Sequence, residues 1–153
     1  MIKQMKKVSV TQGIALVDDG DYHLVVGHKW SCSNGAAMRY DHGIPIYMHR
    51  LIMDAPKGVE VDHINGNRLD NRRCNLRLCT HKQNMQNRGG ERNTSSRYKG
   101  VHWDKNARKW RSMIGVDGKV RHLGYFEIED EAALAYNQAA SQHHGEFARL
   151  NKI

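Results

Sequence analysis

The sequence predicts an α+β protein built from two small parts, and three observations support this prediction. Short β-prone stretches broken by Gly and Asp fill the first third of the 153 residues. A polar, histidine-bearing stretch at 61–84 follows and ends in a helix signature. The last third holds strand-like stretches and then one long helical pattern. We therefore expect a small β-rich N-terminal region leading into a strand, strand and helix core, followed by a three-stranded antiparallel sheet packed on one long helix.

Composition narrows the class of partner. The net charge is +8 and the sequence pI is near 9.6, which favours a polyanion: nucleic acid first, an anionic membrane surface second. No apolar run is long enough to span a membrane, and the start of the chain lacks the apolar core of a secretory signal, so we expect an intracellular protein that is not secreted and has no membrane partner. The three cysteines contain no CxxC pair, which argues against a disulfide framework or a zinc ribbon.

The N-terminal elements follow from short patterns. Residues 8–10 and 14–17 and the alternation of Ile44, Ile46 and Met48 predict strands. A short helix is expected to follow over 48–56, ended by Pro56. The Gly-, Ser- and Asn-rich stretch around 91–97 reads as a linker, which divides the chain into domains 1–90 and 98–153.

The C-terminal domain shows a clear pattern of strands and charge. Strands are expected within 98–103, 109–116 and 120–126, with a hairpin turn at Asp117 and Gly118, and a helix over 128–143 that stops at Gly145. Residues 97–126 hold eight Lys or Arg against two acids, whereas 127–146 hold five acids and no Lys or Arg. We expect the sheet to be basic and the helix side acidic.

The polar stretch 61–84 has the layout of a small catalytic site. Asp62 and His63 end a short strand directly before an Asn-Gly turn. Thr80 and Gln83 form a capping-box pattern, so a helix is expected to begin at His81 and to end at Gly89 and Gly90. Strand, loop, strand and helix would then bring the Asp-His pair opposite a helix that carries Asn84.

At these spacings the stretch resembles the ββα-metal core of HNH nucleases, in particular phage-type homing endonucleases. The likeness covers roughly residues 44–90 and rests on HRLI, VDHINGN, DNR and NLR, with Asn75 twelve positions after His63 and Asn84 nine after Asn75. It implies that Asp62 binds a divalent metal, His63 is the general base, Asn75 braces the loop as part of the catalytic machinery, and Asn84 completes the metal site. Each residue alone could be an ordinary turn or ion-pair residue; together their spacing favours the site.

The chemistry of these residue types agrees with that implication. A neutral imidazole can accept a proton from water near physiological pH. Asn84 stands where the family motif has His, and an amide oxygen beside a carboxylate suits Mg²⁺, with Mn²⁺ as an alternative. His81 is a rival ligand. A zinc site made of Cys74, Cys79 and His81 has atypical spacing, so no structural zinc is expected, and no small-molecule cofactor is indicated.

The domain after the linker has its own resemblance. YKGV, KW, LGYF, EAALAYNQAA and HGEFARLN, spread over 95–151, resemble the plant ethylene-response-factor type (AP-two) DNA-binding domain. That likeness implies a three-stranded sheet lying in the major groove, braced by the long helix. Several positions that are arginine or tryptophan in the plant domains are Lys or His here, so base preference does not carry over. The residues expected at DNA are Lys99, His102, Trp103, Lys105, Lys109, Arg111 and His122 in this domain and Arg50, Arg77 and Arg88 around the nuclease core.

These expectations combine into one hypothesis: a metal-dependent, site-directed endonuclease that hydrolyses phosphodiester bonds in double-stranded DNA, of homing type. A single reaction centre makes nicking by a monomer the default, whereas a double-strand break would need a dimer or sequential cuts. The competing hypothesis is a sequence-specific DNA-binding regulator with an inactive HNH core. A third option is an RNA-directed or structure-selective nuclease.

Overall fold

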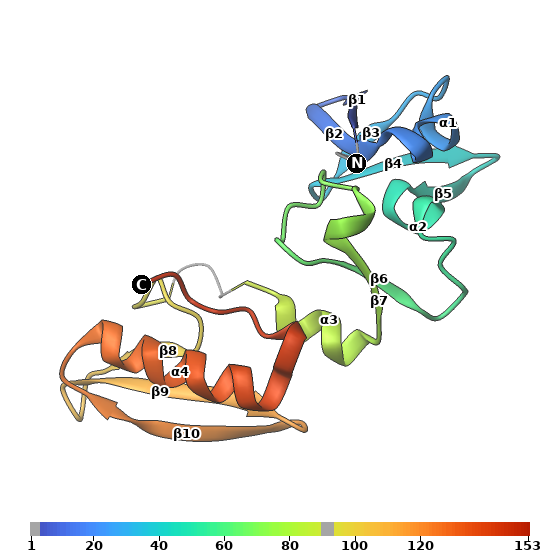
Figure 1. The fold of residues 1–153 in the computed structure, drawn as a ribbon. Helices are drawn as coiled ribbons and strands as arrows, with labels where there is room; N and C mark the ends of the chain where they lie inside the picture. The colour runs from blue at the N-terminus through green and yellow to red at the C-terminus, as the bar shows by residue number, and fades with distance from the viewer. Residues whose placement is uncertain (1–3, 90–93) are drawn as a thin grey trace. The chain divides into compact units, whose positions relative to one another are not determined.

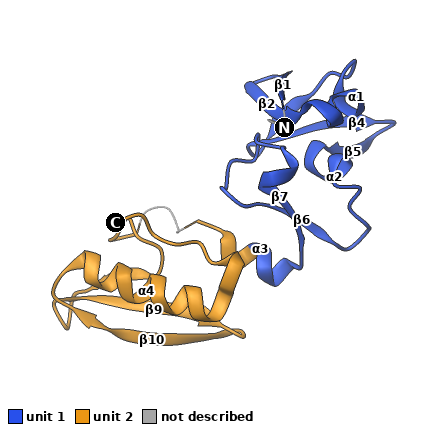
Figure 2. Ribbon diagram, viewed as in Figure 1, with its two compact units in different colours: residues 1–84 blue, residues 85–153 orange. Residues whose placement is uncertain are grey.

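The structure, a computed structural model, describes residues 4–89 and 94–153. The chain divides into two compact units, 1–84 and 85–153 (Figure 2). The α+β class is confirmed, because each unit combines short strands with helices. Part of the expected linker lies outside the described residues, so the domain boundaries at 90 and 98 stay a prediction. Within the described ranges, no helix is long and apolar enough to cross a membrane.

Unit 1 begins with a hairpin and a small sheet (Figure 1). The hairpin pairs β1 with β2, and the sheet has the antiparallel order β3-β4-β5. The strands β3 and β4 were not predicted, because four of their nine residues are Ser or Ala, which carry little β-propensity. The elements are β1 (Met5–Val10), β2 (Gly13–Asp18), η1 (Asp19–Asp21), α1 (Tyr22–Val25), β3 (Ser31–Ser33), β4 (Ala36–Asp41) and β5 (Ile44–Tyr47).

The second half of unit 1 carries the predicted strand, strand and helix arrangement. Its elements are α2 (Met48–Ile52), β6 (Glu60–His63), η2 (Arg73–Asn75), β7 (Leu76–Cys79) and α3 (His81–Asn87). The capping box is confirmed: Thr80 N–H donates to Gln83 Oε1 at 2.8 Å, and Gln83 N–H donates to Thr80 Oγ1 at 3.3 Å. The helix expected over 48–56 ends earlier, at Ile52, because Asp54 adopts a positive φ of 46° that a helix cannot continue through.

One hydrophobic core joins both halves of unit 1. Ala15 and Val17 of β2 are fully buried, and they share a cluster with Met48 and Ile52 of α2 and with Val61 of β6. Trp30 belongs to the same cluster and is 4% exposed. The N-terminal hairpin is therefore part of the fold that carries the Asp-His pair, and it has no core of its own.

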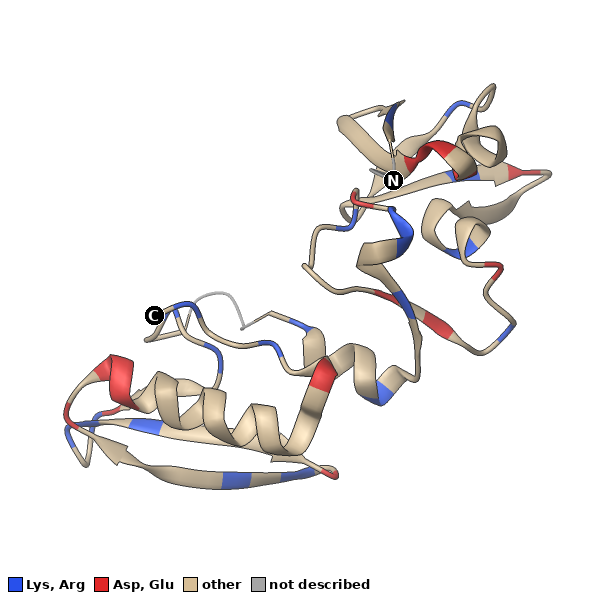
Figure 3. Cartoon of the chain, viewed as in Figure 1, with Lys and Arg blue, Asp and Glu red and all other residues tan. Residues whose placement is uncertain are grey.

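Unit 2 is a sheet of order β10-β9-β8 with one helix packed on it (Figure 1). The hairpin turn predicted at Asp117 and Gly118 is confirmed, since both residues have positive φ, 52° and 74°. Figure 3 shows basic residues on β9 and β10 and acidic residues at the start of α4, as the charge pattern predicted. The elements are β8 (Val101–Asp104), β9 (Lys109–Val116), β10 (Lys119–Phe126), α4 (Glu129–His144) and η3 (Gly145–Phe147).

Candidate functional site

The strand pair β6 and β7 places Asp62 and His63 at the end of β6. Asp62 lies opposite Arg77 and His63 opposite Leu76 in the antiparallel register. Strand β6 ends at His63, and the loop that follows turns at Gly66, whose φ is 76°. Asp62 and His63 are each only 5% exposed. The two residues expected to bind metal and to act as base are thus consecutive in the strand and both largely shielded from water.

His63 is held between two polar neighbours. Its Nε2 lies 3.2 Å from Asn71 Oδ1, and its ring meets the ring of His49 edge-on at a centroid distance of 5.0 Å. Burial is the main reason that the pKa of His63 falls below its ordinary value, and the charge of Arg68 adds to this, whereas the bond from Asn71 and the charge of Asp62 oppose it. The imidazole is therefore neutral at physiological pH and can accept a proton.

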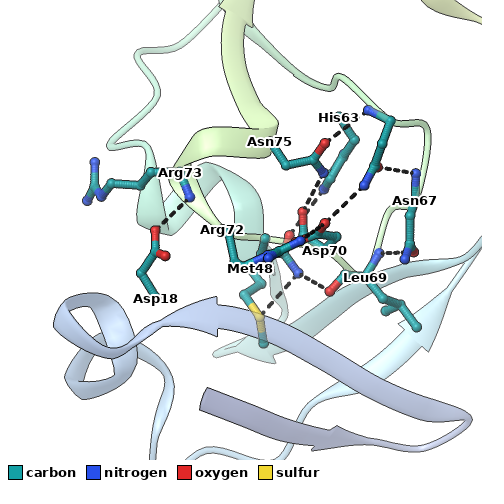
Figure 4. A network of polar contacts seen from close by, with 11 residues as sticks. Asp18, Met48, His63, Asn67, Leu69, Asp70, Arg72, Arg73 and Asn75 are labelled. Atoms are coloured by element: carbon teal, nitrogen blue, oxygen red, sulfur yellow. Dashed lines mark hydrogen bonds and ion pairs between the residues drawn. The ribbon is translucent and has the colours of Figure 1, made fainter. Parts of the chain in front are cut away.

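Asn75 ties together the two ends of the loop that follows His63 (Figure 4). Its Oδ1 accepts the N–H of Asn65 at 2.9 Å, and its Nδ2 donates to the carbonyl of Asp70 at 2.8 Å. Its own carbonyl accepts the N–H of Ile64 at 2.9 Å. These bonds give Asn75 the geometry that a loop brace needs.

Asp62 forms a buried ion pair. Arg77 donates to Asp62 Oδ2 through its Nε at 2.9 Å and through a terminal nitrogen at 2.7 Å. The Arg77 side chain is 12% exposed. The expectation that Arg77 binds a flanking phosphate is therefore corrected: register places it directly across from Asp62, where it neutralises the carboxylate.

Asn84 is hydrogen-bonded to Glu60, a residue that was not among the predicted site residues. Its Nδ2 donates to Glu60 Oε2 at 2.6 Å, and His81 Nδ1 lies 2.8 Å from Glu60 Oε1. Hydrogen bonds from Asn84, and next from His81, hold the pKa of Glu60 below its ordinary value. Strand alternation could have predicted a site role for Glu60, because Glu60 is two positions before Asp62 and therefore lies on the same face of the strand.

The oxygen-bearing side chains expected around the metal are of a kind that suits a hard divalent cation. Asp62 and Glu60 supply carboxylate oxygens from β6, and Asn84 supplies an amide whose Nδ2 faces Glu60, so that its carbonyl oxygen is the atom a cation would take. An oxygen donor set of this kind matches Mg²⁺ or Mn²⁺. In the part of the chain that the structure describes, no three His, Cys, Asp or Glu side chains gather as a metal cluster.

The arginines around this site differ in how they are engaged. Arg50 was expected to contact DNA, and this prediction is corrected. Its guanidinium donates to the backbone carbonyls of Val59, Ala55 and Pro56, so it stabilises the loop between α2 and β6. Arg68 is exposed and donates to the carbonyl of Asn34 at 2.8 Å, and its charge acts on His63.

Two further arginines are in ion pairs: Arg72 with Asp70 and Arg73 with Asp21. Arg88, just after α3, is exposed, which is compatible with its expected phosphate contact.

In unit 2, the outer face of the sheet, opposite α4, collects most of the residues expected at DNA. His102 pairs with Arg111, and Arg111 pairs in turn with Tyr125, so these residues share a face because paired residues point to the same side. Lys109 and His122 lie on the same face by alternation. Lys105 is exposed in the turn after β8. Tyr125 was not among the residues predicted to contact DNA, although alternation along the predicted strand 120–126 indicates which face it lies on.

One expected DNA contact in unit 2, that of Lys99, is corrected. Lys99 is half-buried, and its ammonium donates to the carbonyls of Gln86 and Arg88, both at 2.6 Å. The ammonium of Lys99 is therefore used inside unit 2. Trp103 lies on the same strand face as Val101 and its ring meets Trp110 edge-on at 5.1 Å, but it is 39% exposed, so its expected DNA contact stays a prediction.

Comparisons with known proteins agree with this geometry. A family model described as HNH endonuclease matches residues 47–86. An uncharacterised HNH endonuclease of Acanthamoeba polyphaga mimivirus is 32% identical over 145 residues, which cover 91% of this chain and 75% of the relative. Protein 3.8 of Escherichia phage T7 is 34% identical over 95 residues, 62% of this chain and 78% of the relative.

The C-terminal part matches a different kind of protein. An AP2-like ethylene-responsive transcription factor of Arabidopsis thaliana is 38% identical over 68 residues, which cover 44% of this chain and 14% of that protein. No solved structure matches the chain. The mimivirus relative matches most of the chain, and Asp62, His63, Asn75 and Asn84 occur in the expected strand, strand and helix order. The chain therefore belongs to the HNH endonuclease family and is a DNA endonuclease.

Proposed function

We propose that this endonuclease hydrolyses phosphodiester bonds in double-stranded DNA with a divalent metal ion, in the manner of a phage-type homing endonuclease inside the host cell. The observation that carries the proposal is the buried His63, made neutral by its surroundings and placed next to Asp62 at the end of β6. A general base and a cation are the two requirements for cleaving a phosphodiester with water.

The residues of unit 1 divide this chemistry among them. His63 takes a proton from water, the water oxygen bonds to phosphorus, and the bond from phosphorus to the 3′ oxygen breaks. Asn75 keeps the loop after His63 in place through its bonds to Asn65 and Asp70. Asp62 and Asn84 would hold the metal, which supplies positive charge at the phosphate and the leaving oxygen when bound. We propose Mg²⁺, with Mn²⁺ as the alternative.

Unit 2 is proposed to be a sheet-type DNA reader of the AP-two kind. The shared outer face of His102, Lys109, Arg111 and His122 and the partial match to an AP2-like factor support this role. A small nuclease core contacts phosphate with little sequence information, so a linked reader would supply site preference and raise the effective concentration of DNA. One reaction centre per chain makes a nick the expected product of a monomer, and a dimer would be needed to cut both strands in one event.

Cleavage of supercoiled plasmid tests the nuclease chemistry. We expect nicking with Mg²⁺, none with EDTA, and a loss of about 100-fold or more for His63→Ala, because general-base catalysis contributes at least that much. The matched control is His42→Ala, whose side chain is 97% exposed, and it should cut like the unaltered protein. Gel shifts should show that His63→Ala still binds duplex DNA. Cutting that survives both EDTA and His63→Ala would refute the proposal, and binding without any cleavage would favour a non-cleaving regulator.

Salt-dependent binding tests the reader. Arg111→Ala should weaken binding to duplex DNA and lower the slope of log K against log salt by about 1, because one phosphate contact is lost. Lys152→Ala removes an equal charge outside the strands and is the control. The preference for duplex DNA over duplex RNA and single strands should be clear. Equal effects of the two variants would contradict the assignment of the sheet face.

A further inference from the structure

Asn71 is a buried polar residue to which the mechanism above assigns no role. It has 0% exposure, yet its side chain makes three polar contacts. Oδ1 lies 3.2 Å from His63 Nε2, and Nδ2 lies 3.2 Å from the carbonyl of Leu69 and 3.5 Å from Met48 Sδ. Every end of this amide is therefore matched to a neighbour.

The neighbours determine which way the amide faces. The carbonyl of Leu69 can only accept a hydrogen bond, so the NH₂ end of Asn71 must face it. A reversed amide would bring two oxygens to about the same 3.2 Å and lose that bond. Oδ1 therefore faces His63, and because Oδ1 can only accept, the neutral ring must carry its hydrogen on Nε2. The lone pair of the neutral ring is then on Nδ1.

The backbone around Asn71 is fixed by the N-terminal hairpin. Asn71 N–H donates to the carbonyl of Leu16 in β2 at 2.8 Å, and Leu16 N–H donates to the carbonyl of Leu69 at 2.8 Å. Leu16 and Asp70 form a parallel bridge between the same two segments. On the ring of His63 itself, the edge-on contact with His49 at 5.0 Å restricts tilting. The loop that reaches His63 is thus attached to a strand more than fifty positions earlier in the sequence.

We propose that Asn71 is a positioning residue that holds His63 in the Nε2–H tautomer, so that Nδ1 is the atom that takes the proton from water. The hairpin of β1 and β2 serves the active site by holding Asn71. In the opposite tautomer Nδ1 carries the hydrogen and cannot act as a base. The inference rests on the proposed role of His63 as the general base, and it assigns the atom and the residue that sets it.

Nitrogen NMR of the full-length protein tests the inference directly. The ¹⁵N shifts and ring couplings of a histidine separate protonated from unprotonated nitrogens, and His63→Ala identifies the signals of His63. At neutral pH we expect Nε2 protonated and Nδ1 unprotonated in the unaltered protein. Asn71→Leu, similar in size but without an amide, should give a mixture of tautomers and about 10- to 100-fold slower nicking, with DNA binding kept.

Two more variants separate positioning from general loop stability. Asn71→Asp keeps an acceptor toward Nε2, so the Nε2–H pattern should remain even though its second oxygen loses the bond to the Leu69 carbonyl. Asn67→Ala removes a bond of the same loop, from Leu69 N–H to Asn67 Oδ1 at 3.1 Å, without touching His63, and should leave the pattern unchanged.

Each outcome decides the matter. A protonated Nδ1 in the unaltered protein overturns the inference without any variant, even if Asn71→Leu fails to fold. Unchanged tautomer and unchanged nicking in a folded Asn71→Leu also overturn it. If His63→Ala cuts normally while the Nε2–H pattern is present, it is the proposed function that fails and not the tautomer assignment.

Discussion

Acid should weaken unit 1 through His49, a residue that binds no proton in the folded state until the pH is very low. His49 is 8% exposed, and its Nδ1 has no hydrogen-bond partner among the described residues. Burial foremost, and then the charges of His63, Arg68 and Arg50, lower its pKa from 6.5 to about 3. In the unfolded chain His49 is exposed to water and has its ordinary pKa. It therefore binds a proton at pH values at which His49 of the folded protein stays neutral.

The size of the effect follows from the two pKa values. Between pH 6.5 and about 3 the unfolded state holds more protons at His49 than the folded state, so the free energy of unfolding falls as the pH falls. From pH 7.5 to pH 5 this one group should remove about 2 kcal/mol of stability. The loss is absent above the unfolded pKa, where the imidazole is neutral in both states.

Urea unfolding at pH 7.5 and at pH 5 measures this loss of stability. The chain has three tryptophans, so a background with Trp103→Phe and Trp110→Phe leaves Trp30 as the fluorescent reporter of unit 1. In that background, His49→Phe should lose about 2 kcal/mol less than the parent between pH 7.5 and 5, and the exposed control His42→Ala should lose as much as the parent. Equal losses in all three proteins would refute the reasoning.

Three shorter predictions concern other contacts. Arg77→Ala leaves the carboxylate of Asp62 buried without this partner, so the free energy of unfolding should fall by about 3 to 5 kcal/mol in urea titrations, and a fall below about 1 would contradict the pair's role. Because the pKa of His63 is lowered, the midpoint of the acid limb of kcat/KM for nicking should lie below pH 6.5; a midpoint above 7 would oppose this. Gly100→Ala should destabilise unit 2 by about 2 kcal/mol or more in thermal melts, because φ is +77° and the new Cβ would collide with the ring of Tyr136. Gly115→Ala, where a Cβ meets nothing within 4 Å, is the control.

The elements of the site were predictable because their signals are local. The capping box at Thr80 and Gln83 predicts the start of α3, and the Asn-Gly turn directly after residues 61–63 predicts where β6 ends. The turn at Asp117 and Gly118 predicts the hairpin of unit 2. The bonds of the capping box and of the hairpin turn join residues only a few positions apart, whereas the pairing of β6 with β7 joins residues 13 to 19 positions apart, between His63 and Leu76 and between Glu60 and Cys79.

Side-chain roles were harder to predict because they depend on distant partners. Lys99 and Arg50 are basic residues in basic stretches, and only the folded chain shows that backbone carbonyls already take their hydrogens. Arg77 was expected at phosphate, and the register of β6 with β7 places it on Asp62 instead. Glu60 and Asn71 were not singled out, since their partners lie on other segments.

By itself, the sequence determined the order of elements, the spacing of Asp62, His63, Asn75 and Asn84, and the separation of charge between sheet and helix in unit 2. Those properties depend on neighbours along the chain and on the periods of strand and helix. Only the tertiary structure decided which charges are paired, which atom of His63 faces Asn71, and that the N-terminal hairpin supports the catalytic loop. The physical reason is that the protonation and the availability of a side chain depend on burial and on partners brought close by folding, which chain order does not specify.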